Sequence, residues 1–173
     1  MGTEAPAHIV IADTSVLINF LRVNRVGLLA RLSYEFLITD NVHNEVTTLY
    51  PDQLNCLKEA IEAGIIRVYR VESPEEHALL LKTRKESRRL GVGEASALAA
   101  AVLNKWTFAV DDKAAIKHCR KHYPSTPLIG TADLMCALIQ HGALTVQAAD
   151  VIKDDWAENH SFRLKLGSFA DLI

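Results

Sequence analysis

The chain has few cysteines and no long apolar run. Its three cysteines, Cys56, Cys119 and Cys136, are widely spaced and form no Cys-x-x-Cys pair. This pattern fits unpaired thiols in a reducing cytosol better than a disulfide framework. No apolar segment approaches the length of about 20 residues that a membrane-spanning helix requires. We therefore expect a cytoplasmic protein with no membrane partner.

Targeting signals and a strong net charge are also missing. The first residues, Met-Gly-Thr-Glu-Ala-Pro, contain neither a basic region nor an apolar stretch, so no secretory signal is expected. Pro6 stands where a myristoylation signal has serine or threonine. The net charge of −2 argues against a surface that coats nucleic acid broadly, although a local basic patch is enough for phosphate contacts.

What the chain does contain is a regular alternation of strand-like and helix-like segments. Hydrophobic residues make up 49% and charged residues 23% of the 173 positions, which is typical of one folded domain. Short apolar runs alternating with helical periodicity indicate a parallel sheet covered by helices on both faces. We predict an α/β/α sandwich with about four or five parallel strands. The candidate strands are residues 8–12, 35–39, 65–71, 106–110 and 127–129.

Four acidic residues are the most informative feature of the sequence. Asp13 and Asp111 each follow a predicted strand, and Asp112 stands beside Asp111. The carboxyl ends of parallel strands share one edge, where open sheets bind their ligands. Glu94 opens an alanine-rich helix that runs antiparallel to the next strand, so its start is expected at the same edge as Asp111. Glu45 lies on the helix predicted after the second strand.

Three of these positions have a simpler interpretation when taken alone. Asp13 can cap a helix, Glu45 can lie on a solvated face, and one of the paired aspartates can cap the next helix. Together, two charges ~4 Å apart repel by ~4 kcal/mol at an effective dielectric constant of ~20. Proton uptake relieves part of this repulsion, and a hard divalent cation relieves all of it. We predict a Mg²⁺ or Mn²⁺ site that serves phosphodiester hydrolysis.

Four segments contain these acids, residues 9–19, 41–46, 91–99 and 108–115. In their order along the chain they resemble the motifs of PIN domains. That family includes the VapC-type toxins of toxin–antitoxin pairs. The resemblance covers residues 8–140. We treat residues 1–173 as a single PIN-like domain in which residues 141–173 form a C-terminal helical extension. The resemblance implies a ribonuclease that depends on Mg²⁺ or Mn²⁺, with RNA as its partner.

The resemblance also implies roles for individual acids. It maps the catalytic acids of the family onto Asp13, Glu45, Glu94 and Asp111. The metal ligands become Asp13, Glu94 and Asp111, with Asp112 as an extra ligand. Metal chemistry needs no nucleophilic serine or cysteine, and no Ser/His or Cys/His pair stands out in the sequence.

Substrate contacts are expected from polar and basic side chains near these acids. The basic residues could equally form solvated helix faces, but their placement beside the acids favours phosphate contact. The expected substrate-binding residues are Ser15, Asn19, Arg88, Arg89, Lys113 and Lys117. His118 and His122 have the spacing of a helical metal pair, but no further ligand is evident in the sequence. We therefore place them on the surface or on the RNA side.

Partners and rival functions complete the predictions. Apolar helices between residues 134 and 152 are candidates for contact with an antitoxin protein or with a second copy in a homodimer. One rival function is a catalytically silent PIN-like module that binds RNA or protein. A second rival is a phosphatase of the haloacid-dehalogenase type. That family has a second aspartate two residues after the first, where this chain has Ser15.

Overall fold

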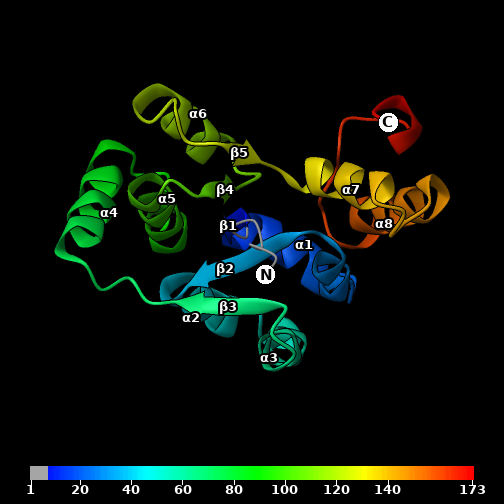
Figure 1. Ribbon diagram of the computed structural model, residues 1–173, viewed down its shortest axis with the longest axis horizontal. Coiled ribbons are helices and arrows are strands. Elements are labelled where there is room, and N and C mark those ends of the chain that lie inside the picture. The colour runs from blue at the N-terminus through cyan, green and yellow to red at the C-terminus, as the bar shows by residue number, and fades with distance from the viewer. Residues whose placement is uncertain (1–7) are drawn as a thin grey trace, which may run out of the picture.

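Five parallel strands form a single sheet in the order β3-β2-β1-β4-β5 (Figure 1). A computed structural model describes residues 8–173 of the chain. The strands are β1 (His8–Ala12), β2 (Tyr34–Thr39), β3 (Ile66–Tyr69), β4 (Thr107–Ala109) and β5 (Leu128–Ile129). The predicted α/β architecture with a central parallel sheet is confirmed.

The order of the strands reverses next to β1. The chain first builds β2 and β3 on one side of β1, and then returns to place β4 and β5 on the other side. In the register of the sheet, Ile11 lies opposite Leu37 of β2 and Phe108 of β4. The point between β1 and β4 is therefore a topological switch point, and ligands of open α/β sheets bind beyond the carboxyl ends of the strands there.

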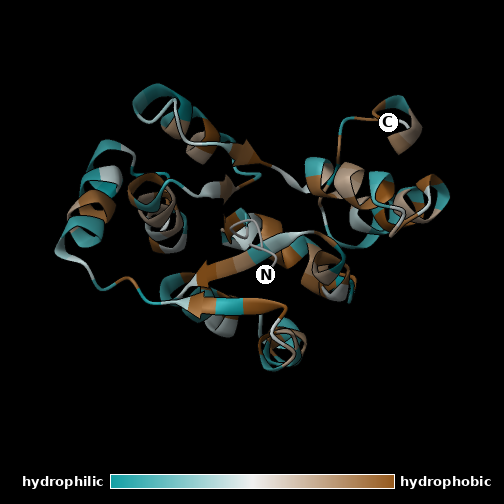
Figure 2. Cartoon of the chain, in the orientation of Figure 1, coloured by the Kyte–Doolittle hydropathy of each residue, from teal (hydrophilic) through white to brown (hydrophobic). Residues whose placement is uncertain are grey.

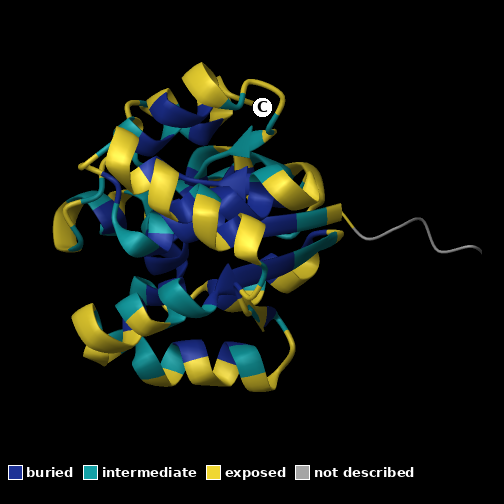
Figure 3. Ribbon diagram, turned by 90° about the vertical axis from the view of Figure 1, so that its left-hand side faces the viewer, coloured by how far each residue is buried: buried dark blue, intermediate teal, exposed yellow. Residues whose placement is uncertain are grey.

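Helices cover the sheet and connect its strands. Val10 and Ile11 are neighbours in β1 whose side chains point to opposite faces, and both are fully buried, so both faces of the sheet are covered (Figure 3). The helices are α1 (Thr14–Arg22), α2 (Asp40–Leu49), α3 (Leu54–Glu62), α4 (Pro74–Glu86), α5 (Val92–Asn104), α6 (Lys113–His122), α7 (Thr131–Gln140) and α8 (Val146–Asn159). The described residues also form the short 3₁₀ helices η1 (Val26–Arg31), η2 (Pro51–Gln53) and η3 (Phe169–Asp171).

Helix α5 packs closely against the sheet, as its alanine-rich sequence predicts. Residues 95–101 are all buried, and most of them are alanine. Because these side chains are small, the helix backbone can approach β1, β2 and β4 closely. Hydrophobic colouring runs along most of the strands and this central helix in Figure 2. The beginning of α5, where Glu94 lies, is thereby held at the carboxyl edge of the sheet.

Polar side chains cap the starts of α1 and α2. Asp13 caps α1, as its simpler interpretation allows, and its side chain accepts a hydrogen bond from the Val16 amide. Thr39 caps α2, and its side chain accepts a hydrogen bond from the Val42 amide. Both caps are the residue at which extended backbone turns into helix, because only there does the side chain face the free amides of the first turn.

The C-terminal segment folds back onto the first helix. Trp156 of α8 is fully buried, stacks edge to face with Phe20 at 6.1 Å, and donates its indole hydrogen to the Asn19 carbonyl oxygen at 2.7 Å. Residues 164–166 are irregular. Within residues 8–173, every helix is too short or too polar to cross a lipid bilayer.

Candidate active site

Asp13 lies where β1 ends and α1 begins, and its side chain is fully buried. One carboxylate oxygen accepts hydrogen bonds from the Ser15 hydroxyl at 2.7 Å and the Val16 amide at 3.1 Å. The Ser15 oxygen in turn accepts the Asp111 amide at 2.9 Å. Ser15 therefore bridges the carboxyl ends of β1 and β4, which brings Asp13 and Asp111 to the switch point as predicted.

Asp111 is oriented by three donors from two helices. Its carboxylate accepts the Thr131 amide at 2.9 Å, the Thr131 hydroxyl, and the Asn19 side-chain amide at 3.1 Å. Asn19 comes from α1 and Thr131 from the start of α7. The backbone carbonyl of Asn19 also accepts a hydrogen bond from the Trp156 indole. Helix α8 therefore supports Asp111 indirectly, through Asn19.

Glu45 and Glu94 meet at the start of α5. Glu45 accepts the Thr14 hydroxyl at 2.7 Å on one oxygen and the Gly93 amide at 2.8 Å on the other. Glu94 accepts the Gly91 amide at 2.8 Å. Backbone amides of a first helical turn favour negative charge nearby, so this helix start stabilises both carboxylates.

Glycines allow the backbone to come this close to the acids. A Cβ added at Gly93 would lie 2.4 Å from a Glu45 carboxylate oxygen, and one at Gly130 would lie 2.9 Å from an Asp111 oxygen. Real Cβ atoms are not found at such distances, so a side chain at Gly93 would displace the Glu45 carboxylate. Absence of a Cβ is what permits the contact at both positions.

Burial raises the pKa of Asp13 to about 8. The hydrogen bonds from Ser15 and Val16 lower this pKa, and the negative charges of Glu94 and Asp111 raise it further. Burial is also the main cause of the raised pKa of Glu94, and Asp112 and Glu45 add to it. For Asp111, burial raises the pKa against the hydrogen bonds from Thr131 and Asn19. Asp13, Glu94 and Asp111 therefore lie in an electrostatic environment that disfavours their ionised forms.

The described residues supply no cation to balance this charge. Within residues 8–173, Asp13, Glu45, Glu94 and Asp111 form no ion pair with lysine, arginine or histidine. A set of carboxylate oxygens fits a hard divalent ion such as Mg²⁺ or Mn²⁺. Their oxygens do not gather in threes within 4.8 Å of one another. Mg²⁺ keeps several waters and binds directly to one or two carboxylates, so it does not need three of these side chains at direct bonding distance.

Asp112 has a defined structural position as well. Its side chain accepts the Ala115 amide at 2.8 Å and caps α6. The alternative that one of the two aspartates is a helix cap is therefore confirmed for Asp112. Its charge still acts on Glu94, so it lies close enough to influence the acids. Its expected part as an extra metal ligand stays a prediction.

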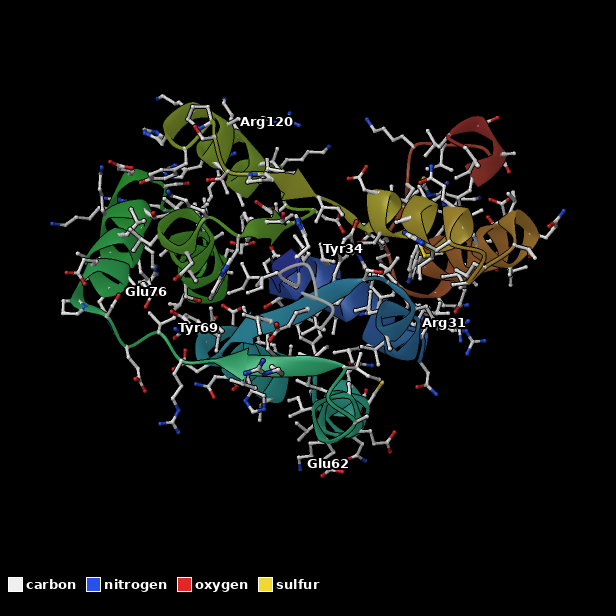
Figure 4. All side chains as sticks on the ribbon, in the orientation of Figure 1. Arg31, Tyr34, Glu62, Tyr69, Glu76 and Arg120 are labelled. Carbon is white, nitrogen blue, oxygen red and sulfur yellow. The ribbon has the colours of Figure 1, made fainter. Side chains whose placement is uncertain are left out.

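Basic side chains continue outward from Asp111. A pocket of about 220 Å³ is lined by Asp111, Asp133, Ile116 and Arg120, among others. A wider depression next to it shares Ile116 and Arg120 and adds three lysines, Lys113, Lys117 and Lys121. Figure 4 labels Arg120 on α6. Of the predicted phosphate contacts, Lys113 and Lys117 lie on this path, whereas Arg88 and Arg89 are exposed in the loop before α5.

Several residues of the site were not predicted. Thr14 and Thr131 donate their hydroxyls to Glu45 and Asp111, and Gly91 and Gly93 donate backbone amides. The rule that parallel strands share a carboxyl edge could have indicated Thr131, because it follows the predicted strand at 127–129. For the backbone amides of Gly91 and Gly93, the only signal in the sequence was the presence of these two glycines just before Glu94.

The comparison with known families agrees with this geometry. A family model described as a PIN domain matches residues 9–168. The chain belongs to the PIN-domain family. The crystal structure of PAE2754 from Pyrobaculum aerophilum is similar to this PIN domain in fold, with a TM-score of 0.55 and 15% sequence identity over 82% of this chain and 94% of that chain. None of the curated proteins compared with the chain matches it.

Membership in this family bears on the functional alternatives. PIN domains are generally metal-dependent nucleases, which agrees with a site built from carboxylates. Membership in the PIN-domain family gives no support to the haloacid-dehalogenase alternative. The family match extends beyond residue 140 and includes α7 and α8. Both helices also contact the site residues, α7 through Thr131 and α8 through Trp156.

Proposed function

We propose that this PIN domain is an endoribonuclease that depends on Mg²⁺ or Mn²⁺ and hydrolyses RNA phosphodiester bonds. One observation carries the proposal: Asp13 is fully buried at the switch point, it shares its surroundings with Glu94 and Asp111, and no basic side chain among residues 8–173 pairs with it. A buried carboxylate without a cationic partner destabilises a fold when it is ionised, and the position of Asp13 at the ligand-binding edge of the sheet gives a functional reason for it.

Asp13, Glu94 and Asp111 would hold the ion, directly or through its bound waters, with Asp112 beside them. When bound, the cation lowers the pKa of a coordinated water and offsets charge on the attacked phosphate. The Ser15 hydroxyl and the Thr131 amide fix the orientation of Asp13 and Asp111. Glu45, held between Thr14 and Gly93, is positioned to accept a proton or to hold a water.

The basic face of α6 supports RNA as the substrate. A net charge of −2 leaves little general attraction for nucleic acid, so phosphate contact depends on local groups. Lys113, Lys117 and Arg120 line the depression that joins the pocket beside Asp111. Such contacts fix the position of the backbone without reading sequence, and the choice of RNA target is therefore left to other parts of the surface.

The deciding experiment is cleavage of a mixed RNA pool by the purified protein with Mn²⁺. We expect cleavage that EDTA abolishes and that Asp13→Asn reduces by at least about 100-fold, since removal of a metal ligand removes transition-state stabilisation. Asp52→Asn is the matched control, because Asp52 is an exposed acid of η2. Equal cleavage by wild type and Asp13→Asn would refute the proposal, and binding of RNA with no cleavage would favour the silent module.

A toxin role is a narrower proposal that rests on the same activity. It predicts growth arrest on expression, lost in Asp13→Asn. Contact with an antitoxin or a second copy through residues 134–152 stays a prediction. Most apolar side chains there are already used within the core of the chain, among them Leu134, Met135, Leu138, Ala149 and Ile152.

A further inference from the structure

A second group of potential ligands lies away from the acids, between α4 and α6. His118 Nε2 and His122 Nδ1 lie 3.7 and 4.0 Å from the same Glu86 oxygen. The ligand atoms of all three residues lie within 4.8 Å of one another, and no other such trio of His, Cys, Asp and Glu is found within residues 8–173. The two imidazole rings stack at 4.5 Å. Glu86 thus provides the third ligand that the sequence alone did not reveal.

The position of His118 corrects the expectation that both histidines lie on the surface. Its residue is only 7% exposed, and its Nε2 is one of three buried side-chain polar atoms without a hydrogen-bond partner within residues 8–173. A second such atom is the hydroxyl of Tyr123, whose ring lies 6.1 Å from that of His118. Buried polar atoms without partners destabilise a fold unless something else satisfies them. The unpartnered nitrogen faces the Glu86 carboxylate, as expected of a ligand position.

We propose that Glu86, His118 and His122 form a Zn²⁺ site distinct from the acidic centre. Two imidazoles and one carboxylate are a known tetrahedral zinc set in which water completes the fourth position. Ligand atoms around tetrahedral zinc lie about 3.3–3.5 Å apart, so the distances of 3.7 and 4.0 Å need to close by well under an ångström. The spacing of four residues places both histidines on one face of α6.

The main structural alternative is an ion-paired cluster without metal. Lys82 lies 3.8 Å from the other Glu86 oxygen, on the same helix. Burial is the main cause of the lowered pKa of His118; His122, Lys121 and Lys82 lower it further, and Glu86 acts in the opposite direction. A neutral imidazole pairs weakly with Glu86 but is the form that binds a metal. The position of Lys82 on the second carboxylate oxygen leaves the first oxygen, Oε2, facing both histidines.

Zinc at this position would fix the end of α4. This helix buries only Glu76, Leu80 and Thr83, so its apolar packing is small. Its start is held by polar contacts, because Glu76 accepts the Tyr69 hydroxyl at 2.7 Å and the Ser73 amide. The proposed ligand Glu86 would hold the other end. The segment after it, residues 87–91, leads to the Gly91 amide that binds Glu94.

The test is titration of metal-free protein with Zn²⁺, followed by calorimetry, and with Co²⁺, followed by visible absorption. Wild type is expected to bind one equivalent of Zn²⁺, to raise its Tm by roughly 5–10 °C at a concentration about 100 times Kd, and to give the strong visible bands of tetrahedral Co²⁺. His122→Gln is expected to weaken binding by at least about 100-fold. His141→Gln, at an exposed histidine after α7, is the control and should bind like wild type.

Two further variants keep the test decisive. Glu86→Gln removes the other partly exposed ligand, so a folding failure in one variant does not end the test. Asp111→Asn should bind Zn²⁺ like wild type, and excess Mg²⁺ should not compete, since Mg²⁺ disfavours imidazole ligands. Absence of Zn²⁺ binding in wild type, unchanged binding in both His122→Gln and Glu86→Gln, or loss of binding in Asp111→Asn would overturn the proposal. None of these outcomes depends on ribonuclease activity.

Discussion

At the scale of single residues, Asp13 combines a structural role with an unfavourable electrostatic environment. It caps α1 and accepts Ser15, yet its full burial raises its pKa to about 8. The usual value in an unfolded chain is about 3.9. Between these two pH values the folded state binds more protons than the unfolded state, so Asp13 makes stability fall as pH rises from about 4 to about 8. Below about pH 4 the carboxyl is protonated in both states, and this loss disappears.

Asp13→Asn should therefore be more stable than wild type when the pH is high and metal is absent. Asparagine keeps the capping oxygen but removes the buried charge. We expect a gain of about 1–3 kcal/mol in the free energy of unfolding near pH 8, shrinking toward zero near pH 4. Urea unfolding in EDTA across this range measures it. A gain that grows toward low pH would contradict the assigned protonation.

Gly93→Ala tests the close approach at the start of α5. The new Cβ would lie 2.4 Å from a Glu45 oxygen and push the carboxylate away. Ribonuclease activity should fall by at least about 10-fold, while the unfolding free energy should change by less than about 1 kcal/mol because alanine favours the helix. Gly27→Ala is the matched control, since its Cβ would meet nothing within 4 Å. A large loss of stability with activity retained would show that Gly93 serves packing alone.

At the scale of elements, the alternation of parallel strands with helices follows from sequence pattern, whereas the order of the strands in the sheet comes from the structure. Strands at 8–12 and 127–129 were expected at or next to the observed β1 and β5, because apolar runs end at clear polar residues. Pattern alone does not choose the cap residues of α1 and α2, since several aspartate, serine, threonine and asparagine residues compete there. Side-chain contacts between helices, such as Glu86 with His118, join residues far apart in sequence and had no signal.

Helix α6 should bind RNA phosphates through its lysines. We expect the double variant Lys113→Gln, Lys117→Gln to raise KM for RNA with kcat retained, and to reduce the slope of log binding against log salt by about 1.4, the value for two contacts to a single strand. Lys58→Gln, an exposed lysine of α3, is the control. Fluorescence anisotropy at several salt concentrations measures the slope. An unchanged slope would place the phosphate contacts elsewhere.

At the scale of the whole molecule, the C-terminal segment and the acids depend on one core. The sequence placed residues 141–173 outside the matched motifs, because no periodicity shows which helix α8 contacts. In the fold, Trp156 fills the core against Phe20 and supports Asn19, whose side chain binds Asp111. Packing between segments far apart in the sequence depends on how well their side chains fit together, and a local stretch of sequence does not show that fit.

Trp156→Ala should accordingly destabilise the entire domain. Truncation of a fully buried tryptophan costs about 3–5 kcal/mol, and the Asn19 carbonyl also loses its donor. Val151→Ala is the control on the same helix, because Val151 is 68% exposed. Thermal or urea unfolding gives the difference. A loss below about 1 kcal/mol, comparable with a surface substitution, would mean that α8 is an independent appendage.

The most direct test of the central claim is binding of Mn²⁺ to the metal-free protein near pH 8, measured by calorimetry on wild type, Asp13→Asn and His122→Gln. We expect wild type and His122→Gln to bind Mn²⁺ at the acids with the same affinity, and Asp13→Asn to bind it at least about 10-fold more weakly. Equal Mn²⁺ affinity in wild type and Asp13→Asn would contradict it, because the buried carboxylate at the end of β1 would then hold no cation.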